Sequence, residues 1–214
     1  MVLSDLSKVV FISGTPCTGK TTIANELNSY LNNNGFYSRL IRINEFATEN
    51  NLIIGEDPDK FYKIIDIERL NEVLSEEIAT FKEGNPNSKG VDLSNGSDDV
   101  SVDSDLSRIL IVEGHVSHLC EGADKMIVLR LDPEILKTRL EARDYSNSKI
   151  QENLEAEALA VCSAEAYELY DKELNEIDTS DKSIDEVLDV ILDILLKDSN
   201  YPVGSVDFMN WLLL

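Results

Sequence analysis

The residues with the clearest chemical meaning form the segment Gly14-Thr15-Pro16-Cys17-Thr18-Gly19-Lys20-Thr21, followed by Thr22. The segment matches G-x-x-x-x-G-K-[ST], the pattern of a loop whose backbone N–H groups surround phosphate oxygens. In such a loop Lys20 reaches the β- and γ-phosphates of a nucleotide, and the Thr21 hydroxyl binds Mg²⁺. Residues 14–22 are therefore predicted to bind the phosphates of ATP, with Lys20 acting on the phosphate that reacts.

The residues on either side are suited to hold this loop. Val9-Val10-Phe11-Ile12 is a short apolar run of the kind found in buried parallel strands. After the loop, apolar residues recur at helical spacing, namely Ile23, Leu27, Tyr30 and Leu31. A helix that begins there directs its favourable dipole at bound phosphate. A chance glycine turn between a strand and a helix is the alternative, and it leaves the match at every motif position unexplained.

A second candidate group follows the apolar run 109–112, which ends in Glu113. A carboxylate at the end of such a strand is placed to approach Mg²⁺ beside the phosphate loop. Gly114 and His115 come next, where α/β folds bind ligands. We expect His115 to position water or phosphate and His118 to be structural. Both histidines could instead bind a metal with Glu113, but no further ligand motif completes such a site.

A third group consists of cations in an otherwise acidic chain. Arg139 and Arg143 are spaced to lie on one face of a helix, and Lys149 follows after a turn. We expect these three residues to cap bound phosphates, with Arg139 and Arg143 stabilising the transferred group. Ordinary pairing with nearby acidic residues is the alternative, and it would contribute little.

Around these groups the pattern predicts alternating strands and helices, and hence an α/β fold with a parallel sheet. Further strands are expected at 37–43, 62–66 and 125–131, and further helices at 45–51, 67–82, 133–143, 150–170 and 183–197. Residues 55–59 are predicted to form a turn. Residues 84–107 are rich in Ser, Asn, Asp and Gly and are expected to be a disordered insertion. The tail, 201–214, is expected to pack back on the core.

Composition limits the possible functions. The 214 residues suit one α/β domain with insertions, and the 43% hydrophobic content is enough for a sizeable core. The net charge of −22 argues against direct DNA binding; it favours solubility, with a basic protein partner or a salt-adapted cytoplasm as alternatives. Three scattered cysteines indicate a reducing compartment. Neither a signal peptide nor a membrane span is recognisable, so we expect a cytoplasmic protein.

Three motifs together resemble a known family. These are the phosphate loop, Val112-Glu113-Gly114-His115, and the stretch that runs from Arg139-Leu140-Glu141-Ala142-Arg143-Asp144-Tyr145 through Lys149 to Glu157. In this order and spacing they resemble adenylate kinase isoenzyme 6 and its archaeal counterparts, from Val9 to about Leu196. The resemblance implies a P-loop NTPase fold in a single domain, 1–200, with helices on both faces of a parallel sheet. It also implies a monophosphate-binding region at about 37–82 and a short lid at about 139–153.

For function, the resemblance implies transfer of the γ-phosphoryl group of ATP to AMP with Mg²⁺. It also implies some ATPase activity and a role in assembly of the small ribosomal subunit through a ribosomal protein. Lys20, Thr21, Glu113, His115, Arg139, Arg143 and Lys149 match the positions of the family's functional residues. Two hypotheses follow: a nucleoside monophosphate kinase, or an ATPase acting in ribosome biogenesis with a basic ribosomal protein. A nucleotide-binding protein without turnover is a third.

The chain also departs from the family pattern. Cys17 and Asp144 stand where glycine is usual in the loop and in the lid, and Glu113 is a longer acid than the usual Asp. Thr48 stands where some relatives carry an arginine that is thought to hold the AMP phosphate. This places AMP affinity in question, and Arg39 or Arg42 could compensate.

Overall fold

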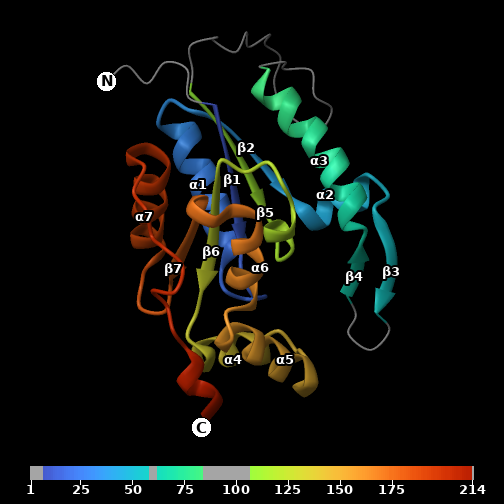
Figure 1. Cartoon of the computed structure of the whole chain (residues 1–214), viewed down its shortest axis with the longest axis vertical. Helices are drawn as coiled ribbons and strands as arrows, with labels where there is room; N and C mark the ends of the chain where they lie inside the picture. Colours follow the sequence, from blue (N-terminus) through green and yellow to red (C-terminus); the bar gives the residue numbers. More distant parts are fainter. Residues whose placement is uncertain (1–6, 58–61, 84–106, 214) are drawn as a thin grey trace.

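The computed structural model describes residues 7–57, 62–83 and 107–213. Its centre is a five-stranded, wholly parallel sheet in the order β2-β5-β1-β6-β7 (Figure 1). The strands of this sheet are β1 (Ser7–Ser13), β2 (Tyr37–Arg42), β5 (Arg108–Glu113), β6 (Lys125–Arg130) and β7 (Leu174–Asp178). The described α-helices are α1 (Lys20–Asn33), α2 (Ile43–Glu49), α3 (Ile67–Lys82), α4 (Pro133–Glu141), α5 (Asn147–Ala158), α6 (Val161–Tyr170) and α7 (Ile184–Lys197).

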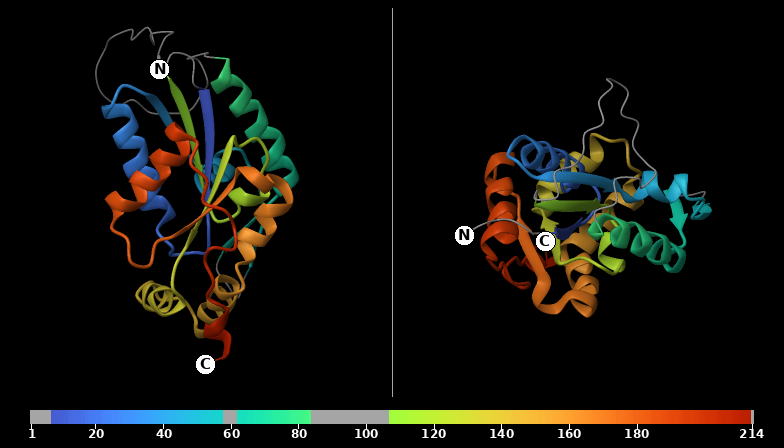
Figure 2. Two further views of the ribbon diagram at one scale, coloured as in Figure 1. Left: turned by 60° about the vertical axis from the view of Figure 1, so that its left-hand side comes forward. Right: turned by 90° about the horizontal axis from the view of Figure 1, so that it is seen from above.

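Alternate residues of the central strands face opposite sides of the sheet, and both sides are covered. Val9 and Phe11 of β1 belong to one apolar cluster, which α3 and α6 complete. Val10 and Ile12 belong to the other, which α1 and α7 complete. Figure 2 shows these helices on the two faces. Because the strands are buried on both faces, they read as continuous apolar runs. The predicted α/β fold with helices on both faces is confirmed.

Local signals set several helix ends. The Asp132 carboxylate caps α4 by accepting from the backbone N–H of Glu134 at 2.8 Å, with Pro133 in the first turn. Ser183 and Glu186 form a capping box at the start of α7, as predicted. On α1, Leu27 is buried within the expected apolar face, but Tyr30 is 42% exposed. The prediction for Tyr30 was wrong, because α1 buries a narrower stripe than its sequence spacing indicates.

The region between β2 and α3 differs from the predicted turn. Residues 55–57 belong to strand β3 (Ile53–Asp57), which pairs antiparallel with β4 (Tyr62–Ile65). The two strands form a separate hairpin beside α2 and α3 (Figure 1). The rest of the predicted turn, Pro58 and Asp59, lies outside the described residues. Gly55 therefore sits within a strand rather than at the start of a turn.

Two further predictions needed correction. The single helix expected at 150–170 is two helices, because Ala160 adopts a left-handed conformation with a φ of 54° between α5 and α6. Strand β7, at the edge of the sheet beside β6, was missed. Its sequence is Leu-Asn-Glu-Ile-Asp, in which Asn175 and Glu176 are polar yet buried. The local sequence therefore lacks the apolar pattern that marks the other central strands.

The tail packs back on the domain, as expected. The carbonyl of Tyr201 accepts from the backbone N–H of Glu176 at 2.8 Å, beside the edge strand. Trp211 packs against the apolar cluster of α4 and α5, and its indole N–H donates to Glu134 Oε1 at 2.7 Å. Most of the expected insertion, 84–106, lies outside the described residues. In the described parts of the chain, no helix is both long and apolar enough to cross a membrane.

Candidate nucleotide-binding site

The predicted phosphate loop joins the end of β1 to the start of α1. Gly14 has a φ of 136°, and a Cβ there would lie 2.4 Å from the Leu129 carbonyl oxygen of β6, so only glycine fits. Gly19, with a φ of 104°, directly precedes α1. The loop therefore passes closely over the sheet and ends at a helix N-terminus, which is a favourable place for phosphate.

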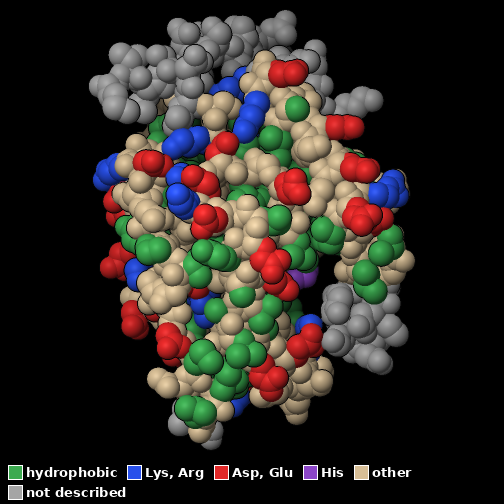
Figure 3. Space-filling model, viewed as in Figure 1, with side chains coloured by type: hydrophobic (Ala, Val, Ile, Leu, Met, Phe, Trp, Pro, Cys, Tyr) green, Lys and Arg blue, Asp and Glu red, His purple; other side chains and the backbone are tan. Residues whose placement is uncertain are grey.

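The loop forms one wall of a cavity of about 1170 Å³. The cavity lies at the carboxyl ends of the strands, where β1 and β5 are neighbours, and its other walls come from α2 and from the α4–α5 corner. Predicted site residues that line it are Pro16, Cys17, Gly19, Lys20, Thr21, Thr22, Glu113, His115, Arg139, Arg143 and Lys149. Gly14, Thr15 and Thr18 do not line it. In the space-filling view a hollow separates the body of the molecule from the β3–β4 hairpin (Figure 3).

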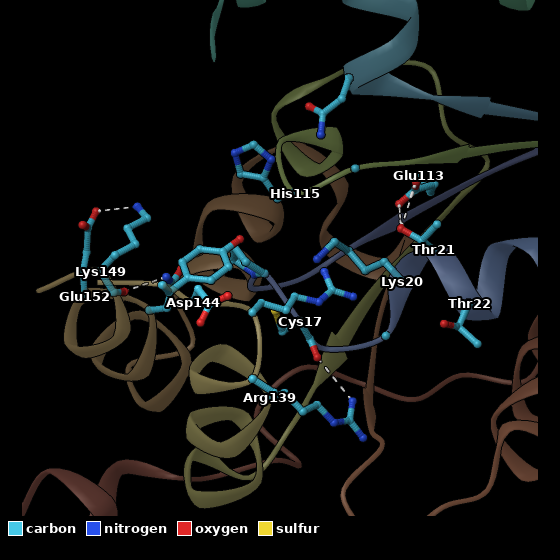
Figure 4. Close-up of a pocket in the computed structure, with 18 of the residues that line it drawn as sticks. Cys17, Lys20, Thr21, Thr22, Glu113, His115, Arg139, Asp144, Lys149 and Glu152 are labelled. Atoms are coloured by element: carbon cyan, nitrogen blue, oxygen red, sulfur yellow. Dashed lines mark hydrogen bonds and ion pairs between the residues drawn. The ribbon is translucent and has the colours of Figure 1, made fainter. Parts of the chain in front are cut away.

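Lys20 is 8% exposed, and its Nζ donates to the carbonyl oxygen of Thr15 at 2.7 Å. Burial lowers the pKa of this ammonium, while nearby groups, among them Cys162 and Glu113, oppose the shift. The side chain lies across the floor of the cavity, pointing along the loop (Figure 4). An anion that enters the cavity would therefore offer Lys20 a partner stronger than the carbonyl it now contacts.

Thr21 and Glu113 face each other at one side of the cavity. The Thr21 hydroxyl donates to Glu113 Oε1 at 3.2 Å, and Oε2 lies 3.4 Å away (Figure 4). Burial raises the pKa of Glu113, whereas the charge of Lys20 and the Thr21 hydrogen bond lower it. A hydroxyl and a carboxylate beside a phosphate loop are the oxygen ligands that suit Mg²⁺, which takes few ligands from protein and the rest from phosphate and water. The two residues therefore fit a magnesium ion.

The two histidines have different surroundings. His115 lines the cavity, and its pKa is lowered to about 4, first by burial and then by the charges of Lys20, His118 and Lys149. Its imidazole is therefore neutral at pH 7. His118 is buried outside the cavity, with Nδ1 2.7 Å from the Ser13 hydroxyl and Nε2 2.8 Å from a Glu165 carboxylate oxygen. These contacts are those expected of a structural residue.

The three cations of the α4–α5 corner line the same cavity as the phosphate loop. The Arg139 guanidinium donates to the Cys17 carbonyl oxygen at 3.3 Å, so it lies against the phosphate loop. Lys149 pairs with Glu152 at 3.3 Å (Figure 4). Arg143 lies at the end of the same corner and is exposed at the mouth of the cavity. The structure thus brings the three predicted cations to one cavity with the loop.

Both departures from glycine retain a left-handed backbone. Cys17 has a φ of 71° and Asp144 a φ of 57°. Most side chains disfavour this region, and Asp tolerates it better than Cys does. Both residues line the cavity. The chain therefore keeps the backbone shape that glycine would favour and adds a thiol and a carboxylate to the walls.

A smaller cavity of about 240 Å³ adjoins the first. Gly19, Thr22 and Arg139 line both cavities. The remaining walls come from the start of α1, from the loop after β7 and from the start of α7, including Thr179 and Ile184. Sequence reasoning missed this second space because it depends on β7, which was not predicted. Asn44 of the larger cavity was also missed, since nothing in its local sequence marks it, and Glu152 and Asn153 were included in the expected lid but not singled out as site residues.

The sequence comparisons agree with this geometry. A family model described as an AAA domain matches residues 10–160. A "Putative adenylate kinase" of Methanothermobacter thermautotrophicus is 38% identical over 205 residues, covering 96% of this chain and 99% of the relative. Proteins of the same description from Methanococcus maripaludis and Methanocaldococcus jannaschii are 34% and 31% identical, and each alignment covers more than 90% of both chains.

The fold and the loop define a P-loop NTPase. Within that class, the chain belongs to the family of these archaeal proteins, as its three motifs predicted.

Proposed function

We propose that this protein is a nucleoside monophosphate kinase that transfers the γ-phosphoryl group of ATP to AMP in the presence of Mg²⁺. The observation that carries the proposal is that one cavity holds the phosphate loop, the Glu113 carboxylate and the cations of the α4–α5 corner. Phosphoryl transfer requires mainly positioning and charge stabilisation, which these groups supply. A volume of about 1170 Å³ exceeds the roughly 300–1,000 Å³ usual for one small ligand, which favours two nucleotides.

The donor is proposed to lie with its phosphates on the loop and its nucleoside in the smaller cavity. Gly19 and Arg139 border both spaces, so a single extended ligand can occupy them together. Backbone N–H groups of the loop and the Lys20 ammonium would bind the phosphate oxygens. Lys20 would exchange its contact with the Thr15 carbonyl for the phosphate.

Thr21 and Glu113 are the residues proposed to hold Mg²⁺. Bound there, the ion would neutralise charge on the β- and γ-phosphate oxygens. The guanidinium groups of Arg139 and Arg143, with Lys149, would stabilise charge on the group in transfer. Residues 139–153 of the α4–α5 corner would close over the cavity as a lid, which would exclude water and so limit hydrolysis.

The acceptor is proposed to enter the hollow between the α4–α5 corner and the region 37–82. Asn44 of α2 lines the same cavity as His115. Arg39 and Arg42 were the candidates to replace the arginine that some relatives carry at position 48, but both have other partners. Arg39 pairs with Glu77 at 2.5 Å, and Arg42 donates to the side-chain oxygen of Asn25 at 2.5 Å.

A lysine of the hairpin is better placed. Lys63 Nζ donates to the Thr48 hydroxyl at 3.2 Å, and the Thr48 hydroxyl itself donates to the Asn44 carbonyl. Asn44 and Thr48 are therefore one helical turn apart on the same side of α2. We assign Lys63 as the cation that attracts the acceptor phosphate in place of an arginine at position 48.

The second candidate function is an ATPase that acts with a basic ribosomal protein of the small subunit. The observation that favours hydrolysis is His115, whose neutral imidazole lines the cavity and can accept a hydrogen bond from an attacking water. The net charge of −22 would steer a basic partner towards the protein. Acidic side chains are spread over the face in Figure 3 rather than gathered in one patch, which suits solubility equally well.

The experiment is to measure ADP production from ATP and Mg²⁺, alone and with each nucleoside monophosphate. Lys20→Ala tests the loop, and Lys172→Ala changes an exposed lysine that precedes β7 and does not line the cavity, which makes it the control. Production that depends on AMP, is lost in Lys20→Ala and persists in Lys172→Ala supports the kinase. Slow production that no monophosphate alters would refute the kinase and favour the ATPase. An increase on adding a basic ribosomal protein would strengthen that second candidate.

A further inference from the structure

A buried carboxylate outside the cavity is hydrogen-bonded to the phosphate loop on the interior side of the loop. Glu157, in the last turn of α5, accepts a hydrogen bond from the Thr15 hydroxyl through Oε2. Thr15 is 3% exposed and Glu157 is 2% exposed, so solvent does not compete for this contact. We propose that Glu157 is a positioning residue that fixes the conformation of the phosphate loop by holding Thr15. The inference rests on the proposed function, because the loop is taken to bind the phosphates of ATP.

Thr15 is hydrogen-bonded to two other residues of the loop. Its carbonyl oxygen accepts from Lys20 Nζ at 2.7 Å and from the Thr18 hydroxyl at 2.9 Å. The direction of that carbonyl depends on the orientation of the Thr15 backbone, which a fixed side chain restrains. The hydrogen bond between Glu157 and Thr15 therefore influences the position of the Lys20 ammonium group indirectly, through the Thr15 carbonyl.

The Glu157 carboxylate is itself held firmly. Its Oε1 accepts from Arg130 Nε at 2.8 Å and from the Leu131 backbone N–H at 3.0 Å. Arg130 Nη2 also donates to the Glu157 carbonyl oxygen at 2.7 Å. Because three donors fix one oxygen and the main chain, the second oxygen has a defined direction, and it faces Thr15.

Arg130 is 1% exposed, and a second carboxylate holds its other side. Arg130 Nη1 donates to Glu176 Oε1, which also accepts from the Ser163 hydroxyl at 2.7 Å. The other oxygen of Glu176 accepts from the Gly204 backbone N–H of the tail at 3.0 Å. The network therefore runs from the tail through β7, β6 and α5 to the phosphate loop.

A contribution to stability alone does not explain why Arg130, Glu157 and Glu176 are charged and buried. Two carboxylates and one guanidinium are removed from water here, and such buried pairs are often no more stabilising than apolar residues of the same shape. Apolar side chains at these positions could fill the space, but they could not accept a hydrogen bond from Thr15. The feature that only the charged network supplies is a fixed acceptor beneath the loop.

The test removes the one hydrogen bond between loop and carboxylate. Thr15→Val keeps the shape of the side chain and lacks the donor, whereas Thr15→Ser keeps the donor. Glu157→Gln removes the charge from the other side. Glu176→Gln is the matched control, since Glu176 is equally buried and contacts the same arginine without contacting the loop.

Two readouts separate the inference from the proposed function. The first is the rate at which iodoacetamide alkylates Cys17 in the nucleotide-free protein, followed by mass spectrometry of its peptide. Cys17 and Cys162 are both half-buried and Cys120 is buried, but burial raises the pKa of Cys120 to about 12 and that of Cys162 to about 11, which slows alkylation of these two thiols. The second is the dissociation constant for ATP with Mg²⁺, measured by calorimetry.

We expect Thr15→Val and Glu157→Gln to alkylate about tenfold faster and to bind ATP about tenfold more weakly, which corresponds to ~1.4 kcal/mol. Thr15→Ser should recover most of both losses, and Glu176→Gln should lower thermal stability while altering neither readout. An unchanged alkylation rate in Thr15→Val would overturn the inference, as would an equal increase in Glu176→Gln. If the wild type fails to bind ATP, the proposed function is wrong, and the alkylation rates still decide the role of Glu157.

Discussion

The half-buried imidazole of His115 makes the stability of the protein depend on pH in a calculable way. Its pKa is about 4 in the folded protein, against an ordinary value of 6.5. Between these values the unfolded chain binds a proton that the folded protein does not. Stability is therefore unaffected by this group above pH 6.5, falls as the pH is lowered through the interval, and reaches its full loss below pH 4. The difference between the two pKa values corresponds to a loss of about 3 kcal/mol in the free energy of unfolding, at about 1.36 kcal/mol per pKa unit.

The measurement is the free energy of unfolding in urea, between pH 7 and pH 4.5, for the wild type and for His115→Asn. Carboxylates also titrate in this range, and they contribute to both proteins, so the difference between the two curves isolates His115. The lowered pKa of His118 acts in the same direction and likewise remains in both. We expect the wild type to lose about 2 kcal/mol more than the variant by pH 4.5, since most of the interval is then crossed.

Parallel curves for the two proteins would refute this reasoning, as would an NMR titration that places the pKa of His115 near 6.5. Either result would mean that the imidazole is hydrated and that its protonation is not set by burial beside Lys20. Bound phosphates would add negative charge near the imidazole and favour its protonated form. ATP should therefore raise the pKa of His115, and the same titration with nucleotide measures that effect.

Three further predictions concern other parts of the molecule. Arg130→Met leaves the carboxylates of Glu157 and Glu176 buried without their arginine and should cost about 3–5 kcal/mol in urea unfolding at pH 7; a loss under about 1 kcal/mol would contradict the network. Cys17→Gly removes the strain of a side chain at a left-handed φ of 71°, which is worth about 1–2 kcal/mol. This gain exceeds the roughly 0.5–1 kcal/mol that the greater backbone freedom of glycine costs, so thermal stability should hold or rise. A clear fall would show that the thiol contacts outweigh the strain. Lys63→Ala should raise KM for AMP about tenfold, the scale of ~1.4 kcal/mol, and leave KM for ATP nearly unchanged; equal effects on both would remove Lys63 from the acceptor site.

The sequence predicted those features whose causes are local. The phosphate loop is a contiguous motif, and Glu113 ends an apolar run, so both could be placed at one edge of a parallel sheet without knowing the fold in detail. Helix α7 was likewise predictable, because Ser183 and Glu186 cap it and its apolar face repeats regularly.

The features that escaped prediction depend on contacts between distant parts of the chain. Strand β7 contains Glu176, which is tolerated in the interior because Arg130 and the Gly204 backbone satisfy it. A reader of the local sequence sees a polar residue and no partner. The break at Ala160 is similar: alanine is the best helix former, yet the chain turns there so that α6 can pack on β6 and β7. The positioning role proposed for Glu157 is therefore visible only once the strands are assembled.

The departures from the family pattern show how far a motif match determines the chemistry of a site. Cys17 and Asp144 keep the left-handed backbone that glycine would adopt, so the shape of the loop and of the α4–α5 corner is preserved. What changes is the cavity wall, where the Asp144 carboxylate now lies in the same lining as Arg139 and Arg143. A negative charge among cations weakens their attraction for phosphate, more so when the cavity is closed to solvent than when it is open. We therefore expect the Asp144 carboxylate to lower the affinity of the proposed site for nucleotide without altering the fold.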